Sequence, residues 1–353
     1  MIVRRCARRS FAAAAPPPKL RLLFCGSDDF SIHALRALHR EHVSNPRLID
    51  TLDVVHRPGK RTGRGLKQIR QVPIKAAADE LALPAHEIDT FTGWVPPAPF
   101  DLVVAVSFGL LVPPRILKQA TYGGLNVHPS MLPDLYGPAP IHHALLRGDA
   151  KTGVSIQTLH PKHFDQGVVL SQTPSPGIAI PEVATCTPQR LIDHLGPIGG
   201  AMLVQVLRER AFIPPLKSAA SESTAEPRHA SKITKEHSHV DFHTWPADRI
   251  VRTLRVVGQL WDTALYSEIL PEAGSPKRIV IHAARIDTGA PAEAHPPGTW
   301  WADNKRQPVP AIGTVTCDGK VIYIESCTIE GSRKGEGTRL LSQALARTSG
   351  PGR

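Results

Sequence analysis

The chain has 353 residues, of which 41% are hydrophobic and 21% are charged; this composition is typical of a soluble globular protein with two domains. No apolar run reaches the ~18 residues that a membrane-spanning helix needs, so the sequence predicts no membrane span. The five cysteines include no C-x-x-C pair, which argues against a disulfide framework and against a thiolate metal site. The formal net charge of +11 permits a nucleic-acid partner without requiring one.

Part of this charge lies in the first residues of the chain. Residues 1–19 carry four arginines and one lysine, are rich in alanine and contain no acidic residue. This pattern is typical of a mitochondrial transit peptide, and the run Arg9-Ser10-Phe11-Ala12 resembles a matrix-peptidase cleavage site. We therefore expect residues 1–19 to be a transit peptide and the protein to reside in the mitochondrial matrix; a disordered basic tail is the alternative. Without them the formal charge is 11 − 5 = +6.

The pattern after the leader predicts an α/β domain over residues 20–210. Three buried strands are expected, at residues 20–26, 48–55 and 100–109, the last a continuous apolar run typical of a strand buried on both faces. Apolar residues at helical spacing follow the first strand and recur over residues 73–83. Strands that alternate with helices in this way predict a doubly wound, mostly parallel sheet.

A basic segment interrupts this domain. Between Val54 and Ala78 the chain has seven lysines and arginines and no acidic residue, and glycines occur at positions 59, 63 and 65. We expect the first half of this segment to be a mobile loop, because glycine permits many backbone conformations. Such a loop can order against phosphates; an ordinary solvated surface is the alternative.

The composition of the sequence changes after residue 210. Residues 211–228 are rich in proline, serine and alanine and read as a linker. Short β-rich stretches follow, and Asp318-Gly319 between two of them predicts a hairpin. We expect a small β-barrel domain over residues 229–346 and a frayed tail at 347–353. From residue 229 onward the chain has 16 basic and 13 acidic residues, which give a net charge of only +3.

The candidate catalytic residues lie in two short segments. Asn126 and His128 stand two residues apart, so on an extended strand their side chains point to the same face. An amide can hydrogen-bond a carbonyl oxygen that becomes an oxyanion, and an imidazole can move a proton, so this pair suits acyl transfer. Asp165, from a later loop, could hold the imidazole and set its tautomer. A structural hydrogen-bonding role is the alternative for each of them.

Three motifs carry a family resemblance: N-V-H-P-S-M-L-P-x-x-x-G-P-A-P-I from Asn126, G-D-x-x-T-G-V-S-I from Gly148 and F-D-x-G-x-V-L from Phe164. In this order they resemble the formyltransferase family that uses 10-formyltetrahydrofolate. The resemblance implies a Rossmann-like catalytic domain in which Asn126, His128 and Asp165 are catalytic. It also implies a set of folate-binding positions, namely the turn Ser130, Met131, Leu132 and Pro133 and the pterin-pocket residues Leu111 and Val112. We expect no metal, because no His/Cys or acidic cluster has ligand spacing.

Further features resemble the methionyl-tRNA formyltransferases within that family. They are G-S-D-D-F at residues 26–30, the basic run at 56–67 and the stretches S-K-I-T-K-E, V-D-F and P-P-G-T in the second domain. The resemblance implies a monomer that formylates initiator methionyl-tRNA for mitochondrial translation initiation, with an OB-like C-terminal barrel that binds tRNA. In that reading the acceptor stem contacts five basic residues, Arg57, Lys60, Arg61, Arg64 and Lys67.

Some positions depart from the family pattern. Bacterial members usually have arginine where this chain has Asp134 and Tyr136, Phe164 replaces a usual leucine, and Val168 stands where an acidic residue is common. These changes touch the rim of the pocket and bear on substrate selectivity. The alternatives are a formyltransferase for a small amine such as glycinamide ribonucleotide, a folate hydrolase, or a non-catalytic RNA-binding protein on the same scaffold. The two enzymes would need neither the basic segment nor a second domain.

Overall fold

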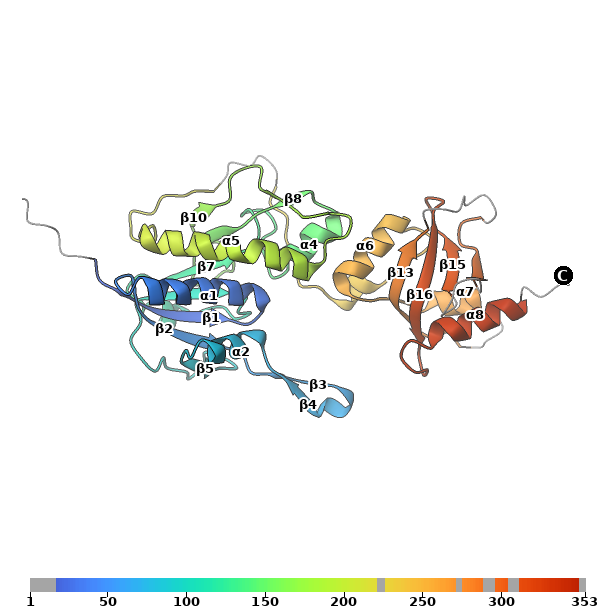
Figure 1. The fold of residues 1–353 in the computed structure, drawn as a ribbon, viewed down its shortest axis with the longest axis horizontal. Coiled ribbons are helices and arrows are strands. Elements are labelled where there is room, and N and C mark those ends of the chain that lie inside the picture. Colours follow the sequence, from blue (N-terminus) through green and yellow to red (C-terminus); the bar gives the residue numbers. More distant parts are fainter. Residues whose placement is uncertain (1–16, 221–225, 271–274, 288–295, 304–310, 349–353) are drawn as a thin grey trace, which may run out of the picture.

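A computed structural model describes residues 17–220, 226–270, 275–287, 296–303 and 311–348. Most of the expected transit peptide, the middle of the expected linker and residues 349–353 lie outside these ranges. The described chain forms two parts, each built on its own β-sheet and joined by an extended segment (Figure 1). None of the helices in these ranges is long and apolar enough to cross a membrane.

The first part is built on a seven-stranded sheet in the order β10-β9-β7-β6-β1-β2-β5. Neighbouring strands from β5 to β7 are parallel, whereas β9 and β10 are antiparallel to their neighbours. The strands are β1 (Leu20–Gly26), β2 (Ile49–His56), β5 (Ala85–Glu87), β6 (Leu102–Val106), β7 (Gly124–His128), β9 (Ser155–Thr158) and β10 (Val169–Gln172). This confirms the expected α/β domain with a mostly parallel sheet, including the central strand β6, whose residues are all buried.

Alternate residues of the strands enter two separate cores. Leu22 and Phe24 of β1 face one core and Leu23 and Cys25 the other, as the period of two in a strand requires. In the described chain five helices contribute to the first core, namely α1 (Asp29–Ser44), α2 (Pro73–Glu80), α4 (Pro140–Arg147), α5 (Pro188–Arg208) and, through Val256, α6 (Ala247–Val257). The short α3 (Pro114–Leu117) and segments that connect strands cover the second. Figure 1 shows α1 and α5 lying along each other.

Small residues bring these two helices together. A Cβ atom at Gly196 would lie 2.3 Å from the ring of His33, and one at Gly200 would lie 2.9 Å from Cβ of Ala37. Both contacts are closer than real Cβ atoms make, so α5 can pack at this distance only with glycine at these positions. At its start α1 is capped by the carboxylate of Asp28, which accepts the backbone N–H of Ser31.

The basic segment differs from the expected mobile loop. It forms a β-hairpin of β3 (Lys60–Thr62) and β4 (Gln68–Arg70), with a 3₁₀ turn at Arg64–Leu66 between them, and it projects away from the sheet (Figure 1). Gly63 and Gly65 adopt φ values of 79° and 72°, which only glycine takes without strain, and so they close the turn. The expectation of a loop was wrong because the repulsion between like charges across the strands does not prevent backbone pairing.

The second part is a five-stranded antiparallel sheet in the order β12-β13-β16-β15-β14. Its strands are β12 (Leu260–Asp262), β13 (Ile279–Ile286), β14 (Trp300–Asp303), β15 (Ala311–Val315) and β16 (Val321–Ile329). The hairpin expected at Asp318-Gly319 is confirmed: it joins β15 to β16, and Gly319 has a φ of 74°.

A closed barrel is not formed by the described residues, since β12 and β14 stand at opposite edges of the sheet. Three helices cover the apolar side chains of this sheet instead, namely α6 (Ala247–Val257), α7 (Ala264–Ile269) and α8 (Gly337–Thr348). Because α8 continues to Thr348, the first residues of the expected frayed tail are helical.

The two parts meet where the linker ends. Ala230 donates its backbone N–H to the carbonyl of Tyr136 at 2.7 Å and accepts the N–H of Ala139 at 3.1 Å. The guanidinium of Arg252 on α6 donates to the carbonyl of Leu146 at the end of α4, with 3.0 Å between Nε and O. The linker end therefore lies directly against the segment that follows β7.

Candidate active site

Asn126 and His128 are presented by β7 at the carboxyl edge of the parallel strands. Val127 between them enters the core beneath α5, where its Cγ1 would lie 3.0 Å from a Cβ atom at Gly199. Alternation along the strand turns the Asn126 and His128 side chains to the opposite face, as the sequence predicted. His128 is 5% exposed. Within the described residues the side-chain amide of Asn126 has no hydrogen-bond partner, so it is free to bind a substrate oxygen.

Each ring nitrogen of His128 faces an oxygen atom. Nδ1 lies 3.5 Å from Oδ1 of Asp165, and Nε2 lies 3.1 Å from the backbone oxygen of Leu135. A neutral imidazole carries one N–H and can donate to only one of these oxygens at a time, whereas the protonated ring can donate to both. The contact with Asp165 was predicted from the sequence, whereas nothing in the motif indicated the contact with Leu135.

Asp165 is buried although it lies in an exposed loop. Its side chain is 6% exposed, and both carboxylate oxygens accept hydrogen bonds: Oδ2 from the backbone N–H of Gly137 at 2.8 Å and Oδ1 from Nε2 of Gln157 at 2.9 Å. Asp165 adopts a φ of 54°, a left-handed conformation that is uncommon outside glycine. Gln157 was missed from the sequence, where the only signal was a glutamine in the β-rich stretch V-S-I-Q-T between two of the family motifs.

The expected folate turn follows β7 directly, and side chains of β9 and β10 bind its backbone. The Ser155 hydroxyl donates to the backbone oxygen of Ser130 at 2.7 Å and accepts the N–H of Leu132 at 3.0 Å. Gln172 donates to the backbone oxygen of Leu132 at 2.7 Å. The Met131 side chain packs so closely that its Cγ would lie 2.4 Å from a Cβ atom at Gly153. Because this side chain is turned inward, a folate would meet the backbone of the turn at this position.

The two expected pterin-pocket residues have different surroundings. Leu111 lines a cavity of about 220 Å³ together with Thr90, Phe91, Thr92, Leu110, Pro113 and Arg115. Val112 is 3% exposed and belongs to the core beneath. The cavity lies beyond the end of β6, whose Ala105 pairs with Asn126 of β7. Leu111 is therefore placed to contact a ligand, whereas Val112 supports the wall behind it.

The basic residues of the hairpin region fall into two groups. Lys60, Arg61 and Lys67 are exposed and pair with no acidic residue in the described part of the chain. Arg57 is partly buried at the base of the hairpin, where its Nη2 donates to Oδ1 of Asp89 at 2.8 Å. Arg64 lies in the 3₁₀ turn, and its side chain lies outside the described atoms. Three of the five predicted tRNA contacts are thus unpaired charges on a projecting element.

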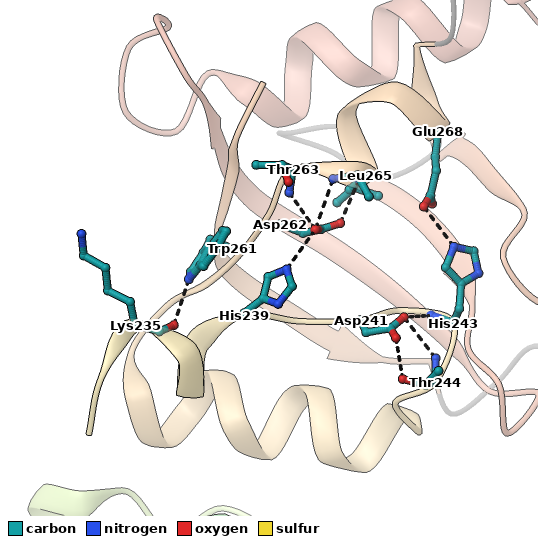
Figure 2. A network of polar contacts seen from close by, with 11 residues as sticks. Lys235, His239, Asp241, His243, Thr244, Trp261, Asp262, Thr263, Leu265 and Glu268 are labelled. Carbon is teal, nitrogen blue, oxygen red and sulfur yellow. Dashed lines mark hydrogen bonds and ion pairs between the residues drawn. The ribbon is translucent and has the colours of Figure 1, made fainter. Parts of the chain in front are cut away.

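A second polar cluster lies in the C-terminal part (Figure 2). Nε2 of His243 lies 3.0 Å from Oε1 of Glu268, and Nε2 of His239 lies 3.3 Å from Oδ1 of Asp262. Asp262 also accepts backbone N–H groups at the start of α7, and Asp241 accepts those of the turn after it. In the described chain no three such side chains are grouped as metal ligands would be. The cluster fastens the segment before α6 to α7 and is structural.

Proteins of known family resemble this chain over most of its length. Residues 20–207 match the family model described as formyl transferase. A mitochondrial methionyl-tRNA formyltransferase of Saccharomyces cerevisiae is 32% identical over 91% of this chain and 88% of its own length. The chain belongs to the formyl transferase family. The mitochondrial methionyl-tRNA formyltransferase of Homo sapiens is 35% identical over 69% of this chain, and the match spans 58% of that protein.

A solved structure supports the fold alone. The crystal structure of WlaRD, described as a sugar 3N-formyl transferase in the presence of dTDP and 5-N-formyl-THF, has a TM-score of 0.52 against this chain. The match covers 89% of this chain and 99% of that one, at 12% sequence identity. The formyl transferase architecture therefore extends over both parts of the chain, while the identity is too low to carry a substrate across.

Proposed function

We propose that this formyl transferase moves a formyl group from 10-formyltetrahydrofolate to the amino group of initiator methionyl-tRNA, for translation initiation in the mitochondrial matrix. The observation that supports this most directly is the His128–Asp165 pair beside the free amide of Asn126, at the sheet edge where the folate turn begins. The names of the similar yeast and human proteins support the choice of acceptor.

The chemistry needs no covalent enzyme intermediate. The neutral amino group of the methionyl ester attacks the formyl carbon, and the carbonyl oxygen becomes an oxyanion that Asn126 stabilises as a donor. Such a donor contributes ~2.7–4 kcal/mol in comparable sites. A protonated His128 would donate to the same oxygen after its Nε2 has given up the contact with the Leu135 carbonyl. When the carbon–nitrogen bond to the folate breaks, the departing nitrogen takes a proton from His128 or water, and the attacking nitrogen loses one.

Folate and tRNA would occupy different surfaces of the chain. The folate would lie across the backbone of Ser130–Pro133 with its pterin toward Leu111, supported by Val112. The acceptor stem would contact the hairpin through Lys60, Arg61, Arg64 and Lys67, whereas Arg57 would anchor the hairpin base. The C-terminal part, residues 229–346, would bind tRNA as an OB-like domain, and the enzyme would act as a monomer without a metal.

One assay tests the function. Labelled 10-formyltetrahydrofolate is incubated with the protein and either charged initiator tRNA or glycinamide ribonucleotide, and the label on each acceptor is measured. We expect transfer to the tRNA alone. Label on the small amine alone would favour the other formyltransferase, release of formate without an acceptor would favour a hydrolase, and tRNA binding without turnover would favour a non-catalytic protein.

The localisation is tested separately. Residues 1–30 fused to a fluorescent reporter should direct it to mitochondria, and protease protection after outer-membrane rupture should place it in the matrix. The same fusion with Arg4, Arg5, Arg8 and Arg9 changed to glutamine is the matched control, because import of such leaders depends on their positive charge. A cytosolic wild-type fusion would contradict the proposal.

A further inference from the structure

Gln157 is a buried polar residue whose two ends both serve the loop that carries Asp165. It lies on β9 opposite Asn126 of β7 and is 1% exposed. Its Nε2 donates to Oδ1 of Asp165 at 2.9 Å, and its Oε1 accepts the N–H of Gly167 at 3.2 Å. One neutral side chain therefore binds this loop at Asp165 and again two residues later.

The loop needs such a restraint because Asp165 is held in an unfavourable conformation. A non-glycine residue with a φ of 54° is strained, and this conformation persists only where the surroundings fix it. Phe164 before it and Val168 after Gly167 are exposed, with 56% and 37% of their surface accessible. Further along, the loop is bound to β9 at Val168, whose N–H donates to the Thr158 hydroxyl and whose carbonyl accepts the N–H of Thr158, each at 2.9 Å. At Asp165 itself, the bonds from Gly137 and Gln157 hold the carboxylate.

Gln157 binds the same carboxylate oxygen of Asp165 that faces the imidazole of His128. Oδ1 of Asp165 accepts from Gln157 and is also the atom 3.5 Å from Nδ1 of His128. Oδ2 is bound by the N–H of Gly137. With both oxygens fixed, the carboxylate cannot rotate away from the imidazole without breaking a buried hydrogen bond.

We propose that Gln157 is a positioning residue for the transfer reaction, which sets the distance and orientation of Asp165 toward His128 and touches no substrate itself. The proposal rests on the proposed function for its kinetic consequences. An amide suits the position because it donates to the carboxylate without adding a charge. Other ionisable groups around the loop make contacts elsewhere: His160 stacks on His163, and the His229 ring lies tilted against Tyr136, with 4.8 Å between the ring centroids. Lys162 is exposed.

Two substitutions separate positioning from a purely structural role. Gln157→Met keeps the volume but removes the donor, and we expect kcat to fall on the order of 10- to 100-fold while both KM values change little. Gln157→Glu keeps the shape. In acid its protonated carboxyl donates to Asp165 as the amide does, but as the pH rises it ionises and repels Asp165. Its kcat should therefore fall as the pH rises, in a range where the wild type stays active.

A surface glutamine provides the matched control. Gln189 on α5 is exposed and donates to Oδ1 of Asp193 at 3.0 Å, so Gln189→Glu makes the same chemical change away from the site. It should leave kcat and the pH profile as in the wild type. A double-mutant cycle with Asp165→Asn adds a second comparison, because residues that act through one another are non-additive. In that background Gln157→Met should cost little more.

Several results would overturn the proposal. The first is a kcat and pH profile equal to those of the wild type in both Gln157 variants. The second is a change in KM with no change in kcat. The third is full additivity of the kcat effects of Gln157→Met and Asp165→Asn. A readout without turnover keeps the test independent of the proposed function. The NMR chemical shifts of the His128 ring protons, compared at one pH, should change in Gln157→Met, because Asp165 is no longer held toward the ring, and should match the wild type in Gln189→Glu. If the wild type transfers no formyl group the proposed function fails, and this NMR comparison still decides whether Gln157 positions Asp165.

Discussion

Arg228 at the end of the linker forms a bidentate ion pair with Asp134, with 2.8 Å between Nε and Oδ1 and 2.5 Å between Nη2 and Oδ2. A carboxylate of the first part therefore pairs with a cation supplied by the linker. The same guanidinium lies 3.2 Å from Oδ2 of Asp149. Two carboxylates of the first part therefore hold the end of the linker.

The pair predicts a dependence of stability on pH. Burial alone would raise the pKa of Asp134, but the hydrogen bonds and charge of Arg228 outweigh it and hold that pKa below its ordinary value. A lowered carboxyl pKa stabilises the fold above the unfolded value of ~3.9, and this stability is lost as the pH falls through the folded value. Because both side chains are about one third exposed, Arg228→Ala should lower the free energy of unfolding at pH 7 by only about 1 kcal/mol.

Urea denaturation at several pH values measures this effect, and the difference from the wild type should shrink below pH ~4. The charge-swapped variant, Asp134→Arg with Arg228→Asp, should recover more stability than the sum of its single changes predicts. If the swap is no better than Asp134→Arg alone, the ion pair does not stabilise this junction.

The catalytic set gives the second prediction. His128→Ala and Asn126→Ala should each reduce formyl transfer by ~10²-fold or more, because each removes stabilisation of the transition state. Folate affinity, measured by equilibrium binding of tetrahydrofolate, should change little, since Ser155 and Gln172 still hold the turn. Asp165→Asn should impair transfer and change its pH profile. Near-normal turnover in either alanine variant would remove that residue from the mechanism.

The third prediction concerns the histidine cluster of Figure 2. The hydrogen bond to Glu268 raises the pKa of His243 above its ordinary value. A raised pKa gives stability that is fully present below the unfolded value of ~6.5 and is lost as the pH rises through the folded value. The pair is solvent-accessible, so we expect only about 0.2–1 kcal/mol. Compared with the wild type, His243→Gln should be less stable at pH 5.5 and equally stable at pH 8.5 in urea denaturation; equal stability at both would contradict this prediction.

The sequence allowed prediction of those features that depend on the pattern of a few neighbouring residues. The apolar run of β6 and the spacing of Asn126 and His128 carry their meaning within a few residues, since a strand has a period of two. Two contacts of the site could not be predicted from the sequence. Gln157 comes from a different strand, β9, and meets Asp165 only once the chain is folded. The contact of His128 with Leu135 is made by a backbone oxygen, which every residue type has. The hairpin was missed because its strands are short and highly charged, and because its glycines were interpreted as the sign of a mobile loop.

The last prediction concerns the projecting hairpin. If Lys60, Arg61 and Lys67 contact phosphates, changing all three to alanine should lower kcat/KM for charged tRNA and leave folate binding unchanged. Each lost contact should also reduce the slope of log affinity against log salt by ~0.7–0.9, so the triple variant should bind tRNA with a clearly flatter salt dependence.

Arg57 provides the internal control for this experiment. Its guanidinium is bound to Asp89, so Arg57→Ala should loosen the hairpin base and weaken tRNA binding without the full change in salt slope. Arg64→Lys tests the tip separately: lysine keeps the charge but lacks the planar fork, and a variant that remains impaired indicates bidentate recognition. Unchanged tRNA kinetics and salt slope in the triple variant would make the hairpin an ordinary solvated surface. Recognition of the tRNA would then depend on the C-terminal part, whose net charge is too small to bind RNA except through a local patch.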